Sequence, residues 1–457
     1  MSTTEVSLRG WFALIVAGAN FLVVFDSTGL SAAFPSIELA FPDVPRSTLA
    51  WLSSGFSIPL ASLLLLAGKL ADRYGRRRIY LGGVALFGLG GIAATASVSI
   101  WMLIAARVVQ GSGGAMMVAT AVALALPEFP VSQRGRAVAV FGSVGATLAL
   151  ISPLVSAVAV GISWRAVFVT GLPICLAVLI VGPRVLSEHP PVQEPEPLDV
   201  IGVIVGTGAV ALLALGLLQS PLWGRTDLRT VSAIAVSAGL FAIFIRRGRT
   251  HPNPIMDLTL FSDRRYATAT ISQMGTQLAI FAFFFSIPLF VVNIWGWSQL
   301  RAGAMIAISL GLVYSSLAFG RYADRHGYRR LLISGGLVIS LGMVWWITML
   351  GSRPSFLLLL PGLVMLGLGQ GMVGSIVTSA AMVTVPDHAL ARANAVHQTT
   401  RRMAHAVGVV AVVAILGDRD SESVMRFRWV WGLILAGNLF ASIVATGYRD
   451  PPKLTKG

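Results

Sequence analysis

Residues 68–78 read GKLADRYGRRR, and residues 320–330 read GRYADRHGYRR. At a constant separation, seven positions carry the same residue in both stretches: Gly68/Gly320, Ala71/Ala323, Asp72/Asp324, Arg73/Arg325, Gly75/Gly327, Arg77/Arg329 and Arg78/Arg330. Glycines let helices and turns approach closely, and an aspartate among cations can form ion pairs or favour a helix N-terminus. This repeat predicts a chain built from two similar halves with the same loop in each.

The composition around the repeat is that of a membrane protein. Of 457 residues, 55% are hydrophobic and 12% are charged, whereas soluble domains carry about 25% charged residues. The net charge of +15 comes from short cationic tracts between apolar runs, which argues against a nucleic-acid partner. The single cysteine, Cys175, excludes a disulfide framework and a Cys-based metal site. We expect a polytopic membrane protein with no metal and no cofactor.

Apolar runs of about 20 residues predict the membrane spans. The first run is too long for the core of a signal peptide, so we expect it to be an uncleaved span. If the N-terminus is cytoplasmic, the loops on that side hold more than twice as many Arg and Lys as the opposite loops, which predicts two cytoplasmic termini. The fourteen predicted spans are 11–33, 48–68, 79–98, 100–126, 136–160, 164–183, 198–219, 228–245, 266–292, 302–320, 331–350, 355–384, 391–416 and 428–447.

The repeat and a proline-rich tract divide these spans. Each copy of the repeat joins the second and third spans of a six-span block, as in parallel halves related by an axis along the membrane normal. The tract 184–198 holds four prolines, which is typical of an extended connector. We therefore expect an all-α fold with an N-terminal six-helix half (1–183), a cytoplasmic linker with two extra transmembrane helices (184–265) and a C-terminal six-helix half (266–457).

Five further stretches resemble one family. They are DSTGLSAAFP at 26–35, Trp51 followed by Phe56, RVVQGSGGA at 107–115, PLFVVNIWGWSQLRAG at 288–303, and Thr400–Gly408. With the duplicated loop, these stretches resemble the fourteen-span drug:proton antiporter family of the major facilitator superfamily over nearly the whole chain. The resemblance implies a major facilitator fold and export of small amphiphilic molecules by proton antiport with alternating access.

The fifth span departs from that family's pattern. Residues 152–157 read SPLVSA where the family has G-P-x-x-G-G, so Pro153 is kept and the three glycines are replaced by small residues. Small residues still permit close helix packing, and the proline still bends the helix. Because of this departure, two alternative functions remain: an uncoupled transporter, or an uptake transporter of an organic anion.

Ionisable residues inside membrane spans are rare and costly, so each is a candidate for function. Asp26 is the one carboxylate well inside a predicted span, and Arg107 is the expected partner. The resemblance implies that both take part in proton coupling. The alternatives are a structural Asp26 capping a broken helix near Thr28 and Gly29, and an Arg107 that extends to the membrane surface.

The penultimate span carries a second group of polar residues. His397, Arg401 and His405 are spaced by four and share one helix face, while Arg402 points about 100° away. Arg401 and His405 could take part in a gate or line the cavity. Alternatively, they could be packing residues without a role in transport. Our candidate cavity residues are Gln110, Arg401, His405, Trp51, Phe56 and Phe284.

The duplicated loop is the predicted cytoplasmic gate, although a solvated cationic loop without a mechanical role is the alternative. The candidate gate residues are Gly68, Asp72, Arg73, Gly75, Arg77, Gly320, Asp324, Arg325 and Gly327.

Other classes of function fit the sequence less well. There is no G-x-x-x-x-G-K-[ST] loop for ATP, and no clustered His, Cys or paired intramembrane carboxylates offer a catalytic site. A non-transporting receptor or scaffold is a further alternative, but it would not need intact gate motifs. The expected partners are a small-molecule substrate, protons and the lipid bilayer, in a functional monomer of a bacterial inner membrane.

Overall fold

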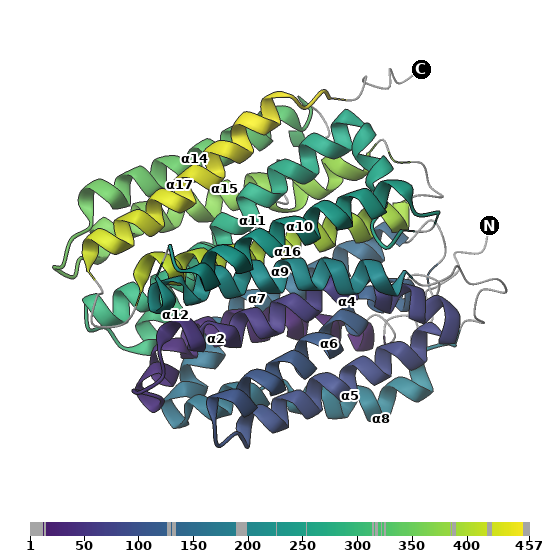
Figure 1. The fold of residues 1–457 in the computed structure, drawn as a ribbon, viewed down its shortest axis with the longest axis horizontal. Coiled ribbons are helices and arrows are strands. Elements are labelled where there is room, and N and C mark those ends of the chain that lie inside the picture. Colours follow the sequence, from purple (N-terminus) through teal and green to yellow (C-terminus); the bar gives the residue numbers. More distant parts are fainter. Residues whose placement is uncertain are drawn as a thin grey trace.

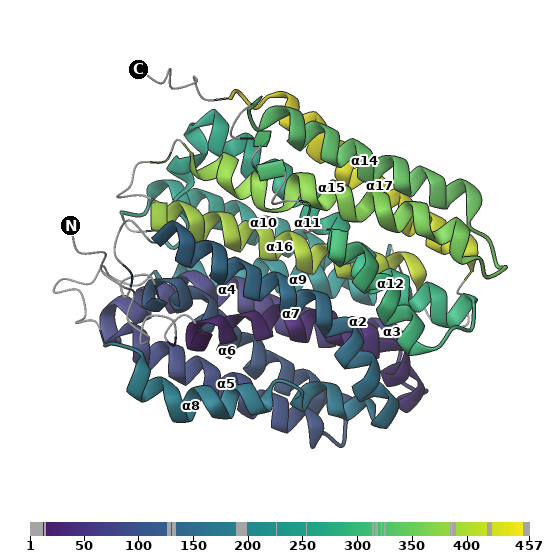
Figure 2. The same cartoon turned by 180° about the vertical axis from the view of Figure 1, so that it is seen from behind.

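The computed structural model describes residues 12, 15–125, 129, 134–188, 199–224, 226–252, 254–312, 315, 319–320, 322–323, 326–383, 385, 390–417 and 423–450. This described part is built from helices that lie side by side along a common direction (Figure 1). The purple-to-blue helices from the start of the chain form one side of the molecule, and the green-to-yellow helices from its end form the other (Figure 2).

The first group of helices covers the chain up to Val185. It consists of η1 (Gly18–Phe21), α2 (Leu22–Ala40), α3 (Arg46–Leu49), α4 (Trp51–Tyr74), α5 (Arg76–Thr95), α6 (Ile100–Ala125), α7 (Arg134–Ile162), η4 (Trp164–Val169) and α8 (Leu172–Val185). Within it, α6 packs against α4 and α5, α8 packs against α5, and α2 packs against α7.

The last group of helices begins at Arg264. It consists of α11 (Arg264–Leu289), the π-helical turn η6 (Phe290–Ile294), α12 (Gln299–Leu312), α14 (Arg329–Met349), α15 (Phe356–Met382), α16 (Leu390–Leu416) and α17 (Val424–Thr446). Here α11 packs against α16 and α17, and α14 packs against α15 and α17.

A helical hairpin connects the two groups. It comprises α9 (Val200–Trp223) and α10 (Leu228–Thr250), followed by the short helix η5 (Leu258–Ser262). Helices α9 and α10 pack along each other, and α9 also contacts α4 of the first group and α16 of the last group. The two groups contact each other directly through α4 with α16, α7 with α12, and α2 with α11. The teal hairpin accordingly lies over the boundary between the groups (Figure 1).

Each predicted span overlaps a helix of the structure. In the part of the chain that is described, eleven helices are long and apolar enough to cross a membrane, or twelve if the bent pair Ile15–Ser31 and Ala33–Ala40 is one span. The chain is therefore an all-helical, multi-pass membrane protein. Fourteen crossings, and the division into two halves with an insertion, stay predictions.

Candidate functional site

The candidate proton site lies between α2 and α6. Asp26 is 7% exposed and Arg107 is fully buried, and Oδ2 of Asp26 lies 2.7 Å from an Nη atom of Arg107. The Nε2 of Gln110 donates a hydrogen bond of 3.0 Å to Oδ1 of the same carboxylate. The expected pairing of Asp26 with Arg107 is confirmed, and Gln110, a candidate cavity residue, joins them.

A third helix, α4, completes the surroundings of Arg107. Its Nε donates a 3.0 Å hydrogen bond to the carbonyl of Leu52, and its guanidinium carbon lies 4.3 Å from the ring centre of Phe56. A buried arginine with these contacts does not extend to the membrane surface, so that alternative was wrong. The guanidinium thus lies beside an anion, a carbonyl and an aromatic face, which are the kinds of neighbour that an arginine inside a membrane protein needs.

Close packing of α4 and α6 holds this arrangement. Gly111 faces the backbone of Phe56 so closely that a Cβ atom would collide with the Phe56 carbonyl. The absence of a side chain at Gly111 therefore permits Arg107, one turn earlier, to reach α4. Trp51 lies at the start of α4, where it packs against the apolar core, and the structure does not bring it to the carboxylate.

The alternative of Asp26 as a helix cap near Thr28 and Gly29 does not fit the geometry. Asp26 lies inside α2, and the bend of 56° comes later, between Ser31 and Ala33. Its carboxylate faces Arg107 and Gln110 rather than backbone N–H groups.

The altered element of the fifth span packs closely against α2. The hydroxyl of Thr28 donates to Oγ of Ser152 at 2.7 Å, and a Cβ on Gly29 would lie 2.5 Å from Oγ of Ser156. On another side of α7, a Cβ on Gly303 of α12 would lie 2.7 Å from the carbonyl of Pro153. Close packing is thus kept without the family's three glycines, since α2 and α12 supply the glycines instead.

The predicted polar face of α16 lies against α11. His397 contacts the hydroxyls of Thr270 and Thr378 at 3.0 and 3.3 Å, so both ring nitrogens have partners. Two turns later the His405 ring stacks on Phe281, with centroids 3.2 Å apart. Phe281 in turn meets Phe284 edge to face. The candidates His405 and Phe284 therefore belong to one cluster, separate from the Asp26 site.

The first copy of the duplicated loop lies between α4 and α5. Asp72 pairs with Arg76 at 3.3 Å, and Arg77 pairs with Glu188 at 3.1 Å. Arg73 lies over the ring of Tyr74. Gly75 has φ of 99°, a conformation that favours glycine. The loop is therefore tied to the segment that follows α8.

The second copy is tied in a comparable way. Gly327 has φ of 91°, and the carboxylate of Asp450 accepts hydrogen bonds from the N–H groups of Tyr328 and Arg329. Asp324 and Arg325, two of the gate candidates, lie outside the described residues. The expected close approach is not found at Gly68 and Gly320, where a Cβ would meet no atom of the described residues within 4 Å.

A buried ion pair was missed from the sequence. Arg46, at the start of α3, donates from Nε and Nη2 to the two carboxylate oxygens of Glu38, and both side chains are at most 3% exposed. The sequence suggested that Asp26 was the only deep carboxylate because the first span was ended before Pro35. In the structure α2 continues through Pro35 to Ala40, so Glu38 lies in the helix.

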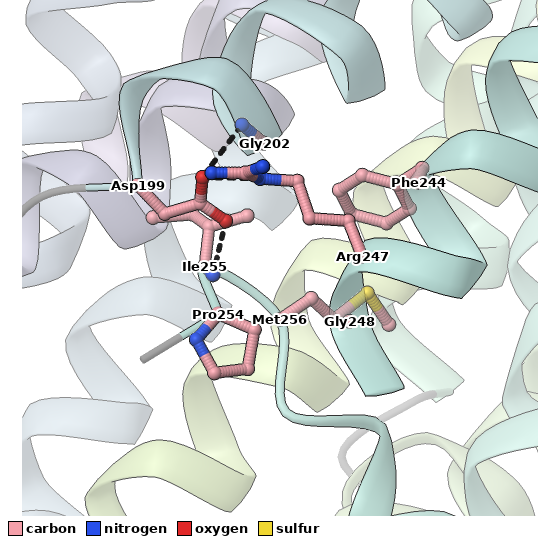
Figure 3. Close-up of a pocket in the computed structure, with 8 residues that line it drawn as sticks. All are labelled: Asp199, Gly202, Phe244, Arg247, Gly248, Pro254, Ile255 and Met256. Carbon is pink, nitrogen blue, oxygen red and sulfur yellow. Dashed lines mark hydrogen bonds and ion pairs between the residues drawn. The ribbon is translucent and has the colours of Figure 1, made fainter. Parts of the chain in front are cut away.

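A further polar cluster was also missed, at the start of the hairpin (Figure 3). Asp199 accepts hydrogen bonds from the N–H groups of Gly202 and Ile255 and from Nε of Arg247. Burial raises the pKa of Asp199, but these three hydrogen bonds lower it, and the net pKa lies below the usual value. The hollow beside the pair is too small for a drug-sized ligand. The cluster fixes α9, α10 and the segment after them.

A family comparison identifies the fold. The model of the Major Facilitator Superfamily matches residues 16–409 and, in a second match, 269–456. Among solved structures, an auto-inhibited POT family peptide transporter superimposes with a TM-score of 0.65 at 17% identity, covering 98% of this chain and 99% of that one. A peptide transporter in complex with sulfate gives 0.70 at 15% identity, covering 96% and 94%. At these identities the likeness shows the fold alone.

Named relatives that match over most of their length are export and resistance proteins. The tetracenomycin C resistance and export protein of Streptomyces glaucescens is 27% identical over 93% of this chain and 80% of its own length. The cephamycin export protein CmcT of Amycolatopsis lactamdurans is 28% identical over 92% and 88%. The multidrug resistance protein Stp of Mycobacterium tuberculosis is 29% identical over 88% and 75%.

Proposed function

This chain belongs to the Major Facilitator Superfamily, and we propose that it exports small amphiphilic molecules from a bacterial cell by proton antiport. It is a multi-pass membrane transporter rather than an enzyme. Relatives named as export and multidrug resistance proteins, over most of both chains, support efflux as its direction.

The observation that carries proton coupling is the buried contact of Asp26 with Arg107 and Gln110. In this arrangement one carboxylate oxygen accepts a hydrogen bond from Gln110, and the other lies 2.7 Å from the guanidinium of Arg107. Protonation of Asp26 removes its attraction to Arg107, and an uncompensated arginine in the membrane interior is unfavourable. The protonated and ionised forms therefore favour different arrangements of the helices that carry them.

The surroundings of the site give that change a route to the rest of the molecule. Arg107 also holds the Leu52 carbonyl of α4, so release of Asp26 alters a three-helix contact. One turn after Asp26, α2 meets α7 through Thr28 and Ser152, and farther on Phe34 meets Phe285 of α11 with ring centres 4.6 Å apart. Movement of α2 would therefore change its contact with α11 at the boundary between the two helix groups. The energy is sufficient, since one charge moving through 100 mV supplies about 2.3 kcal/mol.

The proposed architecture follows the division expected from the repeat. Residues 1–183 and 266–457 form the two moving halves, and 184–265 supply a linker with two added spans, for fourteen crossings and cytoplasmic termini. The loops at Asp72 and Asp324 act as the cytoplasmic gate. Contacts of α4 with α16 and of α7 with α12 are the interfaces that would open and close. We propose a functional monomer.

An uncoupled or uptake transporter of an organic anion is the second candidate. The specific observation in its favour is the fifth-span element, in which Ser152, Ser156 and Ala157 replace the family's glycines.

Transport into inverted membrane vesicles separates the two candidates. Export by antiport predicts substrate accumulation that depends on an imposed pH gradient, acid inside. Accumulation that is the same with and without the gradient would reject proton antiport and favour the uncoupled transporter.

A further inference from the structure

The last six long helices contain buried cations and no acidic residue. No Asp or Glu occurs in α11, α12, α14, α15, α16 or α17. Arg402 is 8% exposed, and Arg401 beside it is half-buried. Neither arginine forms an ion pair with a carboxylate of the described residues, and Asp26 is already occupied by Arg107. Two positive charges in the middle of a membrane helix therefore have no counter-ion among the residues that the structure describes.

The face shared by α11 and α16 positions Arg401. His397 meets Thr270 at one level of the two helices, and His405 meets Phe281 two turns farther on. Arg401 lies midway between the two histidines on the same face of α16. Gln277, seven residues after Thr270 and four before Phe281, occupies the corresponding level of α11. Arg401 and Gln277 thus belong to one polar stretch, which lies between the His397–Thr270 contact and the His405–Phe281 contact.

Several buried polar groups on these helices have no hydrogen-bond partner among the described residues. They are both amide atoms of Gln273, Oε1 of Gln277 and Nδ1 of His405, all on side chains that are at most 6% exposed. The guanidinium of Arg401 has only a long contact of 3.4 Å, to Gln398 on its own helix. Buried polar groups are normally hydrogen-bonded, and an unpaired charge in the membrane is costly.

We infer that this stretch binds the carboxylate of an acidic, aromatic amphiphile, with Arg401 as the anion contact; the inference rests on the proposed function and specifies its substrate class. A carboxylate accepts charge-assisted hydrogen bonds from Arg401 and from the amide of Gln273. Arg402, about 100° around the helix, adds positive potential without direct contact. Phe281 and Phe284, which meet edge to face next to His405, offer an apolar surface for the ring of the ligand.

Binding of three matched probes to the purified full-length protein tests this site. The probes are 6-(dansylamino)hexanoate, its uncharged methyl ester, and an analogue of the same length ending in trimethylammonium, each followed by dansyl fluorescence. The variants are Arg401→Gln, the charge-keeping Arg401→Lys, and Arg428→Gln as a control. Arg428 lies near the start of α17, where it donates to the carbonyl of Leu350, so its loss removes an arginine from another helix.

We expect the hexanoate to bind most tightly and Arg401→Gln to weaken it at least about tenfold. Arg401→Lys should keep most of that affinity, and Arg428→Gln should leave it unchanged. Tighter binding of the trimethylammonium probe, or hexanoate binding that is unchanged in a folded Arg401→Gln protein, would overturn the inference. If Arg401→Gln does not fold, the question is decided by the wild-type ranking of the three probes and by Gln273→Leu, which removes the unpartnered amide donor and is expected to weaken hexanoate binding severalfold.

The proposed function is tested separately in the same experiment. The three probes are also offered to inverted vesicles with and without a pH gradient. If none is transported by the gradient although the hexanoate binds through Arg401, proton antiport fails and the anion site stands. If the trimethylammonium probe is transported and the hexanoate neither binds nor moves, antiport stands and the anion site fails.

Discussion

Arg46 and Glu38 form a two-point ion pair that is buried between the end of α2 and the start of α3. Helix α3 also contacts α9 and α16, so the pair lies where both helix groups and the hairpin meet. Removing one partner of a buried pair leaves an uncompensated charge, which costs about 3–5 kcal/mol.

We therefore expect Glu38→Gln to lower the free energy of unfolding in detergent by about that amount. The control is Asp72→Asn, which breaks an exposed i,i+4 pair with Arg76 that contributes only about 0.3–0.5 kcal/mol. Equilibrium unfolding followed by tryptophan fluorescence measures both. Equal losses in the two variants would contradict the assigned burial of Glu38.

Gly111 is expected to tolerate no side chain. In Gly111→Ala, the new methyl group meets the Phe56 carbonyl, forcing α6 away from α4 and displacing Arg107. Overpacking of this kind costs about 1–3 kcal/mol, and we expect transport to fall at least about tenfold. Gly239→Ala in α10 is the matched control, because a methyl group there meets no atom of the described residues within 4 Å. Normal transport by Gly111→Ala would show that the α4–α6 spacing does not position Arg107.

The lowered pKa of Asp199 predicts how the stability of the folded protein depends on pH. Because it is lower in the folded protein than the usual value of about 3.9, the ionised carboxylate stabilises the fold above that pH. This contribution is lost as the pH falls through the folded-state pKa. Asp199→Asn keeps an oxygen that can cap α9 but removes the charge facing Arg247. We expect its thermal stability to be lower than wild type at pH 7, with the difference shrinking below about pH 4. A difference that stays constant with pH would contradict this assignment.

The proposed gate role of Asp72 concerns the relative populations of the transporter's conformational states rather than the free energy of unfolding. States of a transporter differ by a few kcal/mol, so losing Asp72 should change the balance between them. Spin labels on the loop ends of α4 and α16 in Asp72→Ala should give a distance distribution different from wild type. The same label pair in Asp227→Ala is the control, since Asp227 caps α10 at its start, in the hairpin. Identical distributions in wild type and Asp72→Ala would discard a gate role for Asp72.

The sequence predicted the helices and the Asp26–Arg107 contact for a common physical reason. A long apolar run in a bilayer must form a helix, because only a helix satisfies its backbone hydrogen bonds there. A carboxylate in the first predicted span and an arginine in the fourth both need a partner inside the membrane. The face of α16 was also predictable, because residues spaced by four share a side of a helix.

Contacts that depend on loops and helix ends were not predictable in the same way. The first span was predicted to end at residue 33, yet the chain bends nearby and continues as a helix to Ala40, which buries Glu38. Asp199 lay at the edge of the predicted span 198–219 and was given no role, although Arg247 and Ile255 come from elsewhere in the chain to bind it. Gly68 and Gly75 look alike in the motif, but only Gly75 adopts a positive φ. Such differences depend on tertiary geometry that residue spacing does not contain.

The central claim is that protonation of Asp26 couples the pH gradient to export. The most direct measurement is gradient-driven uptake of a transported probe into inverted vesicles by wild type, Asp26→Asn and Asp26→Glu, at equal amounts of folded protein. Asparagine keeps the size and one acceptor but cannot ionise, so we expect Asp26→Asn to abolish the part of uptake that depends on the gradient. Asp26→Glu should retain some of it. Gradient-dependent uptake by Asp26→Asn at the wild-type rate would contradict the account.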